Sequence, residues 1–264
     1  MINELVVRLT PKKLYVFFDN VISRFYRIVN TMIFKGNKYN CPFCNHSFRK
    51  FLPVGYKHGI LFDMKVIGGG HRPNAMCPSC RSIDRERLTY IFLEQHQCIK
   101  QGIKLLHIAP EKNLQKALRQ KSFEYYSADL DSPFADIKMN IQDIDFPDNY
   151  FDGIICNHVL EHVPDDLKAM REFYRVLKKG GWAVLQVPYS PLLETSIEDP
   201  LVIGRKKRME VYGQDNHVRM YGLDYTDKLS CAGFKVSLES VGSNEEELYA
   251  LNPAEKLFFC TKVV

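Results

Sequence analysis

The stretch from residue 151 to residue 187 constrains the fold of this chain more than any other. It opens with a continuous apolar run at 151–156, which is typical of a parallel strand buried on both faces. After a polar loop, apolar residues recur at helical spacing over 167–177, and glycines at 180–181 are expected to stop that helix. A second strand is expected over 182–187. A strand–helix–strand unit of this kind predicts an α/β fold with a doubly wound, mostly parallel sheet.

Three motifs in and before this stretch carry a family resemblance. They read DIDFPDNYFD, LEHVPDD and EFYRVLKKGG, and they occur in this order along the chain. The chain resembles class I S-adenosylmethionine-dependent methyltransferases, with a core like that of the type 11 methyltransferases. The resemblance covers residues 104–187, about a third of the chain. It implies a Rossmann-like sheet, S-adenosylmethionine as cofactor, and methyl transfer as the activity.

Further apolar runs predict the other strands of this sheet, at 104–109, 123–128, 135–139, 233–240 and 256–263. Asp129 directly follows one of them, where a carboxylate can accept hydrogen bonds from both ribose hydroxyls of a nucleoside cofactor. The resemblance implies that Asp143 hydrogen-bonds the adenine amino group and that Asn157 faces the methyl-transfer site. Outside these motifs, each acid would be interpreted as a solvated turn residue.

The loop after the predicted strand at 104–109 departs from the family pattern. That loop is normally rich in glycine, so that the backbone can approach the cofactor. Here it reads LLHIAPEKN: His107 stands where an acid is common, and Ala109, Pro110 and Glu111 replace the expected glycines. Ala109 is small enough for close approach, and Glu111 can hydrogen-bond the ammonium group of the cofactor's methionine part.

Two interpretations of this loop remain open, a rearranged cofactor loop or a chain that has lost cofactor binding. We favour the first, because Asp129, Asp143 and the NHVLEHV loop are all kept. The sequence HIAPE is also similar to the loop of a poorly characterised bacterial methyltransferase group that carries a cysteine-rich N-terminal region.

Two C-x-x-C pairs form the second strong signal. Cys41 and Cys44 make the first pair, and Cys77 and Cys80 make the second. Each pair can present two thiolates from one turn, so together they predict a closed, structural Cys₄ zinc site in a zinc-ribbon-like module. Thioredoxin-type redox motifs are the alternative, although two in tandem are unusual.

We therefore expect an N-terminal amphipathic helical segment at 1–36, a zinc-ribbon-like module with a connecting helix at 37–100, and a methyltransferase domain at 101–264. Within the last, an insertion at 188–222 would form a substrate lid. Residues 1–100 carry 16 Lys and Arg against 6 Asp and Glu. This excess of positive charge indicates an anionic partner, such as RNA, a phospholipid surface or a phosphorylated glycan precursor.

The apolar and aromatic run at 14–34 is interrupted by charged residues, which argues against an ordinary membrane-spanning helix. We expect a helix docked on the protein itself or on a second subunit. The alternative is peripheral membrane contact through residues 12–34. A cytoplasmic protein is expected, peripheral to a membrane under the second interpretation.

The lid insertion contains the sequence YGQDNHVRMYG. In an extended segment its alternating Asp215, His217 and Arg219 would point to one side, near the end of a strand where such sheets bind ligands. Asp215 and Arg219 are the expected substrate-binding residues, because a guanidinium can hold a carboxylate or phosphate on the acceptor. A polar loop with local hydrogen bonds is the alternative.

Methyl transfer from a sulfonium needs positioning and, for a hydroxyl or amine acceptor, removal of a proton. His158 is the first candidate for the base and His217 the second, whereas His162 is expected to brace the loop. The expected acceptor is an anionic small molecule or glycan. The alternatives are RNA, recognised through the zinc ribbon, and a non-catalytic binding protein with an altered cofactor loop.

Overall fold

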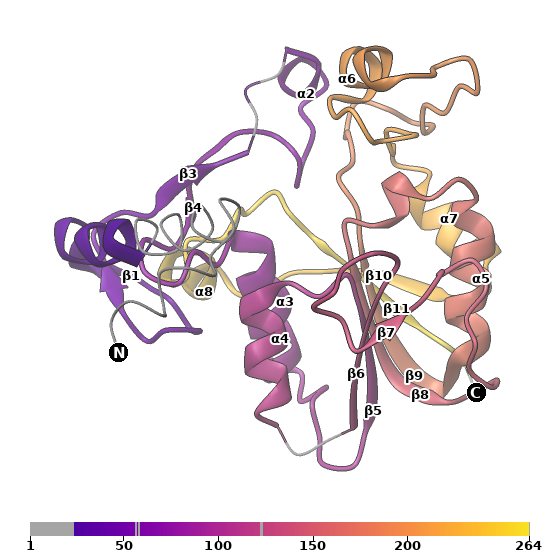
Figure 1. Ribbon diagram of the computed structural model, residues 1–264, viewed down its shortest axis with the longest axis horizontal. Coiled ribbons are helices and arrows are strands. Elements are labelled where there is room, and N and C mark those ends of the chain that lie inside the picture. The colour runs from indigo at the N-terminus through magenta and orange to yellow at the C-terminus, as the bar shows by residue number, and fades with distance from the viewer. Residues whose placement is uncertain (1–23, 56, 58, 122–123, 264) are drawn as a thin grey trace, which may run out of the picture.

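The computed structural model describes residues 24–55, 57, 59–121 and 124–263, and its core is a seven-stranded sheet (Figure 1). The strand order is β10-β11-β9-β8-β5-β6-β7, and only β11 runs antiparallel to its neighbours. The strands are β5 (Lys104–Ile108), β6 (Glu124–Asp129), β7 (Ile137–Lys138), β8 (Phe151–Asn157), β9 (Leu177–Gln186), β10 (Lys235–Glu239) and β11 (Leu257–Thr261). This arrangement agrees with the expected doubly wound, Rossmann-like sheet. The strand order reverses between β5 and β8, which is where sheets of this type bind ligands.

Helices cover both faces of the sheet. On one side lie α3 (Asp84–Gln95) and α4 (Lys112–Arg119), and on the other α5 (Asp166–Val176) and α7 (Tyr225–Cys231) (Figure 1). Adjacent strand residues serve opposite layers: Leu105 packs with the α3–α4 layer, whereas Leu106 packs with the α5 layer. Strands buried on both faces explain the continuous apolar runs of the sequence.

The junction between α5 and β9 differs from the expectation. The helix ends at Val176, and Leu177 already pairs with Phe151 in the sheet. The backbone N–H of Tyr150 also donates to the Val176 carbonyl at 2.8 Å. Because these contacts draw the chain into the sheet at once, the glycines at 180–181 lie inside β9 and do not stop the helix.

The N-terminal module contains two small antiparallel pairs. These are β1 (Lys35–Asn40) with β2 (Ser47–Phe48), and β3 (Leu52–Val54) with β4 (Arg72–Met76). Before β1, residues 24–33 are helical, whereas the first part of the run at 14–34 lies outside the described residues. Among the described residues, no helix is long and apolar enough to cross a membrane.

The insertion at 188–222 packs against the N-terminal module. Its helix α6 (Arg205–Tyr212) lies beside α2 (Gly59–Asp63), as Figure 1 shows. Ile67 and Tyr189 exchange backbone hydrogen bonds of 2.9 and 3.2 Å. The module and the insertion therefore meet above the carboxyl end of β9, an arrangement that the sequence did not predict.

A second connection runs through Arg87 of α3, whose side chain is completely buried. Its guanidinium donates to the carbonyls of Ala75 and Ser82 in the module, at 2.8 and 2.7 Å. It also donates to the carbonyls of Tyr249 and Ala250, which follow α8 (Ser243–Leu248), at 2.8 and 3.1 Å. One side chain therefore joins the module to the C-terminal part of the domain.

We predict that Arg87→Leu lowers the free energy of unfolding by about 3 kcal/mol or more, because it leaves several buried carbonyls without a donor. Urea denaturation of the full chain measures the change. As a control, Arg171→Leu on the exposed face of α5 should change stability by less than about 0.5 kcal/mol. Equal losses in the two variants would contradict the role of Arg87 as a joint.

Candidate functional site

Three of the expected cofactor residues meet at the carboxyl ends of β5 and β8. Glu111 accepts a hydrogen bond from Asn157 Nδ2 at 3.1 Å, and its other oxygen lies 3.0 Å from His107 Nε2. Burial opposes the ionisation of Glu111, but the His107 hydrogen bond and nearby positive charge outweigh it and lower the pKa of Glu111. The altered loop therefore places a carboxylate at the switch point of the sheet. The roles of the three residues toward a cofactor stay predictions.

Ala109 has the backbone conformation that the missing glycine would adopt. Its φ of 45° lies in the left-handed region, which a non-glycine residue rarely occupies. Its N–H donates to the carbonyl of Ala128 on β6 at 2.8 Å, and this bond holds the loop against the sheet. The loop therefore keeps a glycine-like course at this position although it contains no glycine.

The two acids expected to hold the nucleoside part lie in turns. Asp129 ends β6, and its Oδ1 accepts the backbone N–H groups of Asp131 and Ser132, both at 2.8 Å. Asp143 is exposed, and its backbone N–H donates to Asn140. These positions match the expected places at the edge of the sheet, and binding of a ribose or an adenine stays a prediction.

The loop after β8 brings a buried histidine beside a buried acid. His158 has a φ of 55°, and its Nδ1 lies 3.5 Å from Glu161 Oε1. His158 Nε2 and Glu161 Oε2 are buried and have no hydrogen-bond partner among the described residues. Burial lowers the pKa of His158 and raises that of Glu161 to about 8. Sequence reasoning missed Glu161, although its spacing of three from His158 was visible.

The insertion at 188–222 supplies the next member of this group. The imidazole of His217 lies 4.7 Å from that of His162, ring centre to ring centre, with the rings nearly perpendicular. Burial lowers the pKa of His217 to about 3. The two candidate bases therefore border the same site from two segments: His158 from the loop after β8 and His217 from the insertion. Glu161 and His162 also border it, both from the loop after β8.

A cavity of about 240 Å³ lies between these segments. It is bordered by residues from the N-terminal module, the loop after β8 and the insertion, among them Arg72, Arg85, His158, Glu161, His162 and His217. Arg85 Nε is buried without a hydrogen-bond partner among the described residues. The cavity therefore combines unpaired acceptors with positive charge.

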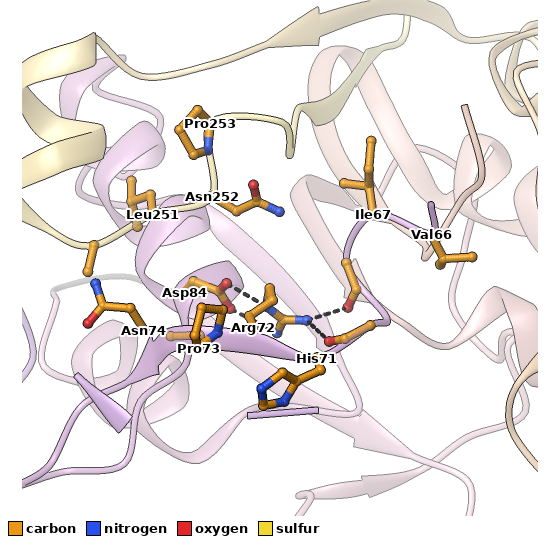
Figure 2. Close-up of a pocket in the computed structure, with 14 residues that line it drawn as sticks. Val66, Ile67, His71, Arg72, Pro73, Asn74, Asp84, Leu251, Asn252 and Pro253 are labelled. Atoms are coloured by element: carbon orange, nitrogen blue, oxygen red, sulfur yellow. Dashed lines mark hydrogen bonds and ion pairs between the residues drawn. The ribbon is translucent and has the colours of Figure 1, made fainter. Parts of the chain in front are cut away.

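A second cavity, of about 400 Å³, shares Gly68 and Arg72 with the first. Figure 2 shows Arg72 between the carboxylate of Asp84, at 2.6 and 2.9 Å, and the backbone carbonyls of Gly68 and Gly70, both at 3.2 Å. Arg72 therefore lines both cavities with a guanidinium that is hydrogen-bonded on two sides.

The two expected substrate-binding residues have partners inside the protein. Asp215 pairs with Arg205 of α6 at 2.7 Å. The guanidinium of Arg219 is fully buried and directs all of its N–H groups to protein acceptors. These acceptors are the Glu198 carboxylate and the backbone carbonyls of Leu160, Val163 and Pro164. These contacts favour a structural role for Arg219, and binding of an acceptor by Asp215 and Arg219 stays a prediction.

The four cysteines of the C-x-x-C pairs converge. Their sulfur atoms lie within 4.8 Å of one another, with 3.5 Å between Cys41 and Cys80 and 3.7 Å between Cys44 and Cys77. A tetrahedral ion with Zn–S bonds of about 2.3 Å would separate its sulfurs by about 3.8 Å. The geometry therefore suits the zinc ion that the sequence predicts.

The two cysteine turns also share one backbone pattern. The N–H of Asn45 donates to Cys41 O, and the N–H of Arg81 donates to Cys77 O, at 2.9 and 3.0 Å. Asn45 and Arg81 both have positive φ. Each turn therefore points two thiols toward the centre, as in zinc knuckles.

We predict about one thiolate-bound Zn²⁺ per chain in protein purified without chelator, measured by elemental mass spectrometry. Replacing both Cys41 and Cys77 by Ser should remove that ion and unfold the N-terminal module. Cys231→Ser, at an exposed cysteine outside the cluster, should retain the ion. A wild-type chain without thiolate-bound metal would refute the zinc site.

Comparisons with known proteins find sequence similarity over the core of the chain. Residues 94–185 match the family model described as "Methyltransferase domain". A stretch of 58 residues is 41% identical to the ubiquinone/menaquinone biosynthesis C-methyltransferases of Vibrio cholerae and Yersinia pestis. It covers 22% of this chain, and the chain spans only about a fifth of the length of these relatives.

Two solved structures show a weaker likeness. The YcgJ protein of Bacillus subtilis has a TM-score of 0.44 at 16% identity, covering 65% of this chain and 92% of that one. The 1,6-didemethyltoxoflavin N1-methyltransferase of Burkholderia thailandensis has a TM-score of 0.45 at 13% identity, covering 66% and 76%. These scores are too low to carry an argument about function. The sequence match stands by itself: residues 94–185, about a third of the chain, are similar to a methyltransferase domain.

Proposed function

We propose that this protein is an S-adenosylmethionine-dependent methyltransferase that acts on a small-molecule acceptor, a sugar or another metabolite with a hydroxyl group. One observation carries the proposal. The unpartnered Nε2 of His158 borders a polar cavity directly after β8, where a doubly wound sheet binds its ligand. The methyltransferase domain supplies the reaction class.

The residues around the switch point suit the cofactor. The carboxylate of Glu111 can hold the ammonium group of the methionine part, and Ala109 keeps the backbone course of the usual glycine. Asp129 and Asp143 lie at the ends of the neighbouring segments for the ribose and the adenine. The methyl group would then point toward Asn157 and the cavity.

The chain's contribution to the reaction is positioning and removal of one proton. The acceptor O–H donates its proton to Nε2 of His158 while its oxygen forms a bond to the methyl carbon. The bound cofactor would supply the activated methyl group, and its sulfonium would keep the electrons of the broken sulfur–carbon bond as a neutral thioether. Glu161, at 3.5 Å from Nδ1, orients the imidazole so that Nε2 faces the cavity.

The size and charge of the cavity support an anionic acceptor of small size. Arg85 borders the cavity with an unpartnered Nε, and guanidinium groups suit carboxylate or phosphate, whereas Arg72 is already paired with Asp84. The C-methyltransferase relatives share only a 58-residue stretch, 22% of this chain, so their role in quinone biosynthesis is not transferred to this chain. In this proposal the Cys₄ ion is structural, and it holds the module that supplies Arg72 and Arg85.

We predict that the full chain binds S-adenosylhomocysteine in a calorimetric titration and that Asp129→Ala weakens binding by roughly 10-fold or more. A lost hydrogen bond to a charged group is worth roughly 1.5–3 kcal/mol. Asp143→Ala should have a smaller effect. Asp131→Ala, which removes a neighbouring exposed carboxylate, should bind like the wild type. Absence of binding at millimolar ligand would replace the enzyme proposal with a non-catalytic one.

We predict that His158→Asn lowers kcat by roughly 10²–10⁴-fold and leaves S-adenosylhomocysteine affinity unchanged. Asparagine tolerates the left-handed backbone of this position, so the fold is retained. The assay follows labelled methyl groups from S-adenosylmethionine into the small-molecule fraction of a cell extract. His96→Asn, at an exposed histidine, is the control. Label that enters RNA alone would contradict the proposed acceptor class.

A further inference from the structure

A second group of metal-binding side chains lies apart from the cysteines. Glu161, His162 and His217 each place one ligand atom within 4.8 Å of the others. Glu161 is 1% exposed and His217 is 6% exposed. Two imidazoles and one carboxylate are a ligand set that binds divalent transition metals, and it leaves positions open for other ligands.

The hydrogen bonds of both rings leave one nitrogen for a metal. His162 Nδ1 lies 3.3 Å from the Asn216 carbonyl, and its Nε2 lies 4.0 Å from Glu161 Oε1. His217 is hydrogen-bonded to the backbone of Tyr212. Histidines that bind metals commonly donate their other N–H to a backbone carbonyl, which fixes the ring and the tautomer. Both rings here have that second partner.

The carboxylate is the strongest sign that a partner belongs here. Glu161 Oε2 is buried and has no hydrogen-bond partner among the described residues. A buried acceptor without a donor is costly, and a cation beside it removes that cost. Its other oxygen, Oε1, lies 3.5 Å from His158 Nδ1 and 4.0 Å from His162 Nε2, so the carboxylate lies between the two rings.

We propose that Glu161, His162 and His217 bind a divalent transition-metal ion that faces the 240 Å³ cavity. The 4.0 Å between His162 Nε2 and Glu161 Oε1 is wider than the roughly 3.3 Å between neighbouring ligands of a tetrahedral ion with bonds near 2.0 Å, so binding would draw these two side chains together. Because His217 belongs to the insertion, the ion also fastens the lid to the loop after β8. That the ion holds the acceptor oxygen is an extension that rests on the proposed function.

The charges around the cavity bear on this site. Arg72 is paired with Asp84, whereas Arg85 adds positive charge that opposes binding of a cation. An anionic acceptor compensates that charge. The site lacks thiolates, so its ion differs spectroscopically from one bound by the cysteine cluster.

The test uses the full chain with its cysteine cluster loaded with Zn²⁺, titrated with Co²⁺ alone. We expect Co²⁺ to bind with the weak visible absorption of nitrogen and oxygen ligands and without a thiolate charge-transfer band. Glu161→Gln and His217→Ala should each weaken binding by about 100-fold or more, whereas His96→Ala should bind like the wild type.

Two outcomes overturn the proposal: a wild-type chain that takes up no Co²⁺ beyond the cysteine cluster, and a His217→Ala chain with wild-type affinity. The Co²⁺ titration of the wild-type chain tests the metal site even where a variant fails to fold. Because the readout is metal binding, its failure leaves S-adenosylhomocysteine binding intact. If the chain takes up Co²⁺ but does not bind S-adenosylhomocysteine, the metal site stands and the methyltransferase proposal fails.

Discussion

The hydrogen bonds of the buried Arg219 guanidinium fix the arrangement of the segments that form the candidate site. The guanidinium joins the Glu198 carboxylate of the insertion to three backbone carbonyls of the loop after β8. A buried arginine is stable only where its donors are satisfied, so the two segments hold a fixed relation. That relation brings His217 of the insertion against His162 and Glu161 of the loop. Without it, the cavity would lose one wall.

The N-terminal module forms part of the same cavity and packs against the rest of the chain. Arg87 ties it to the C-terminal segment after α8, and the backbone pairing of Ile67 with Tyr189 ties it to the insertion. Arg72 and Arg85 then reach the cavity from this side. A structural ion in the cysteine cluster would therefore affect the cavity indirectly, because it would stabilise the module that carries Arg72 and Arg85.

The loop after β5 has a backbone conformation that L-residues rarely adopt. Ala109 adopts a left-handed φ that costs an L-residue about 1–2 kcal/mol. The hydrogen bond to Ala128 and the network of Glu111 with His107 and Asn157 offset that cost. Strain of this kind commonly marks functional sites, and His158, at the end of β8, has the same conformation.

Periodicity and local motifs in the sequence were sufficient to predict the strands of the sheet and the two cysteine turns, because these depend on neighbours along the chain. The doubly wound sheet was expected from the strand–helix–strand unit together with the family resemblance. Tertiary structure alone decided which polar residues meet. Arg219 and Asp215 look alike as lid residues, yet one is buried among carbonyls and the other pairs with Arg205. The sequence did not identify Glu161 as a site residue, because Glu161 and His217 lie some fifty residues apart and meet only in the folded chain. Burial and long-range contact give these side chains their chemistry, and neither leaves a local pattern.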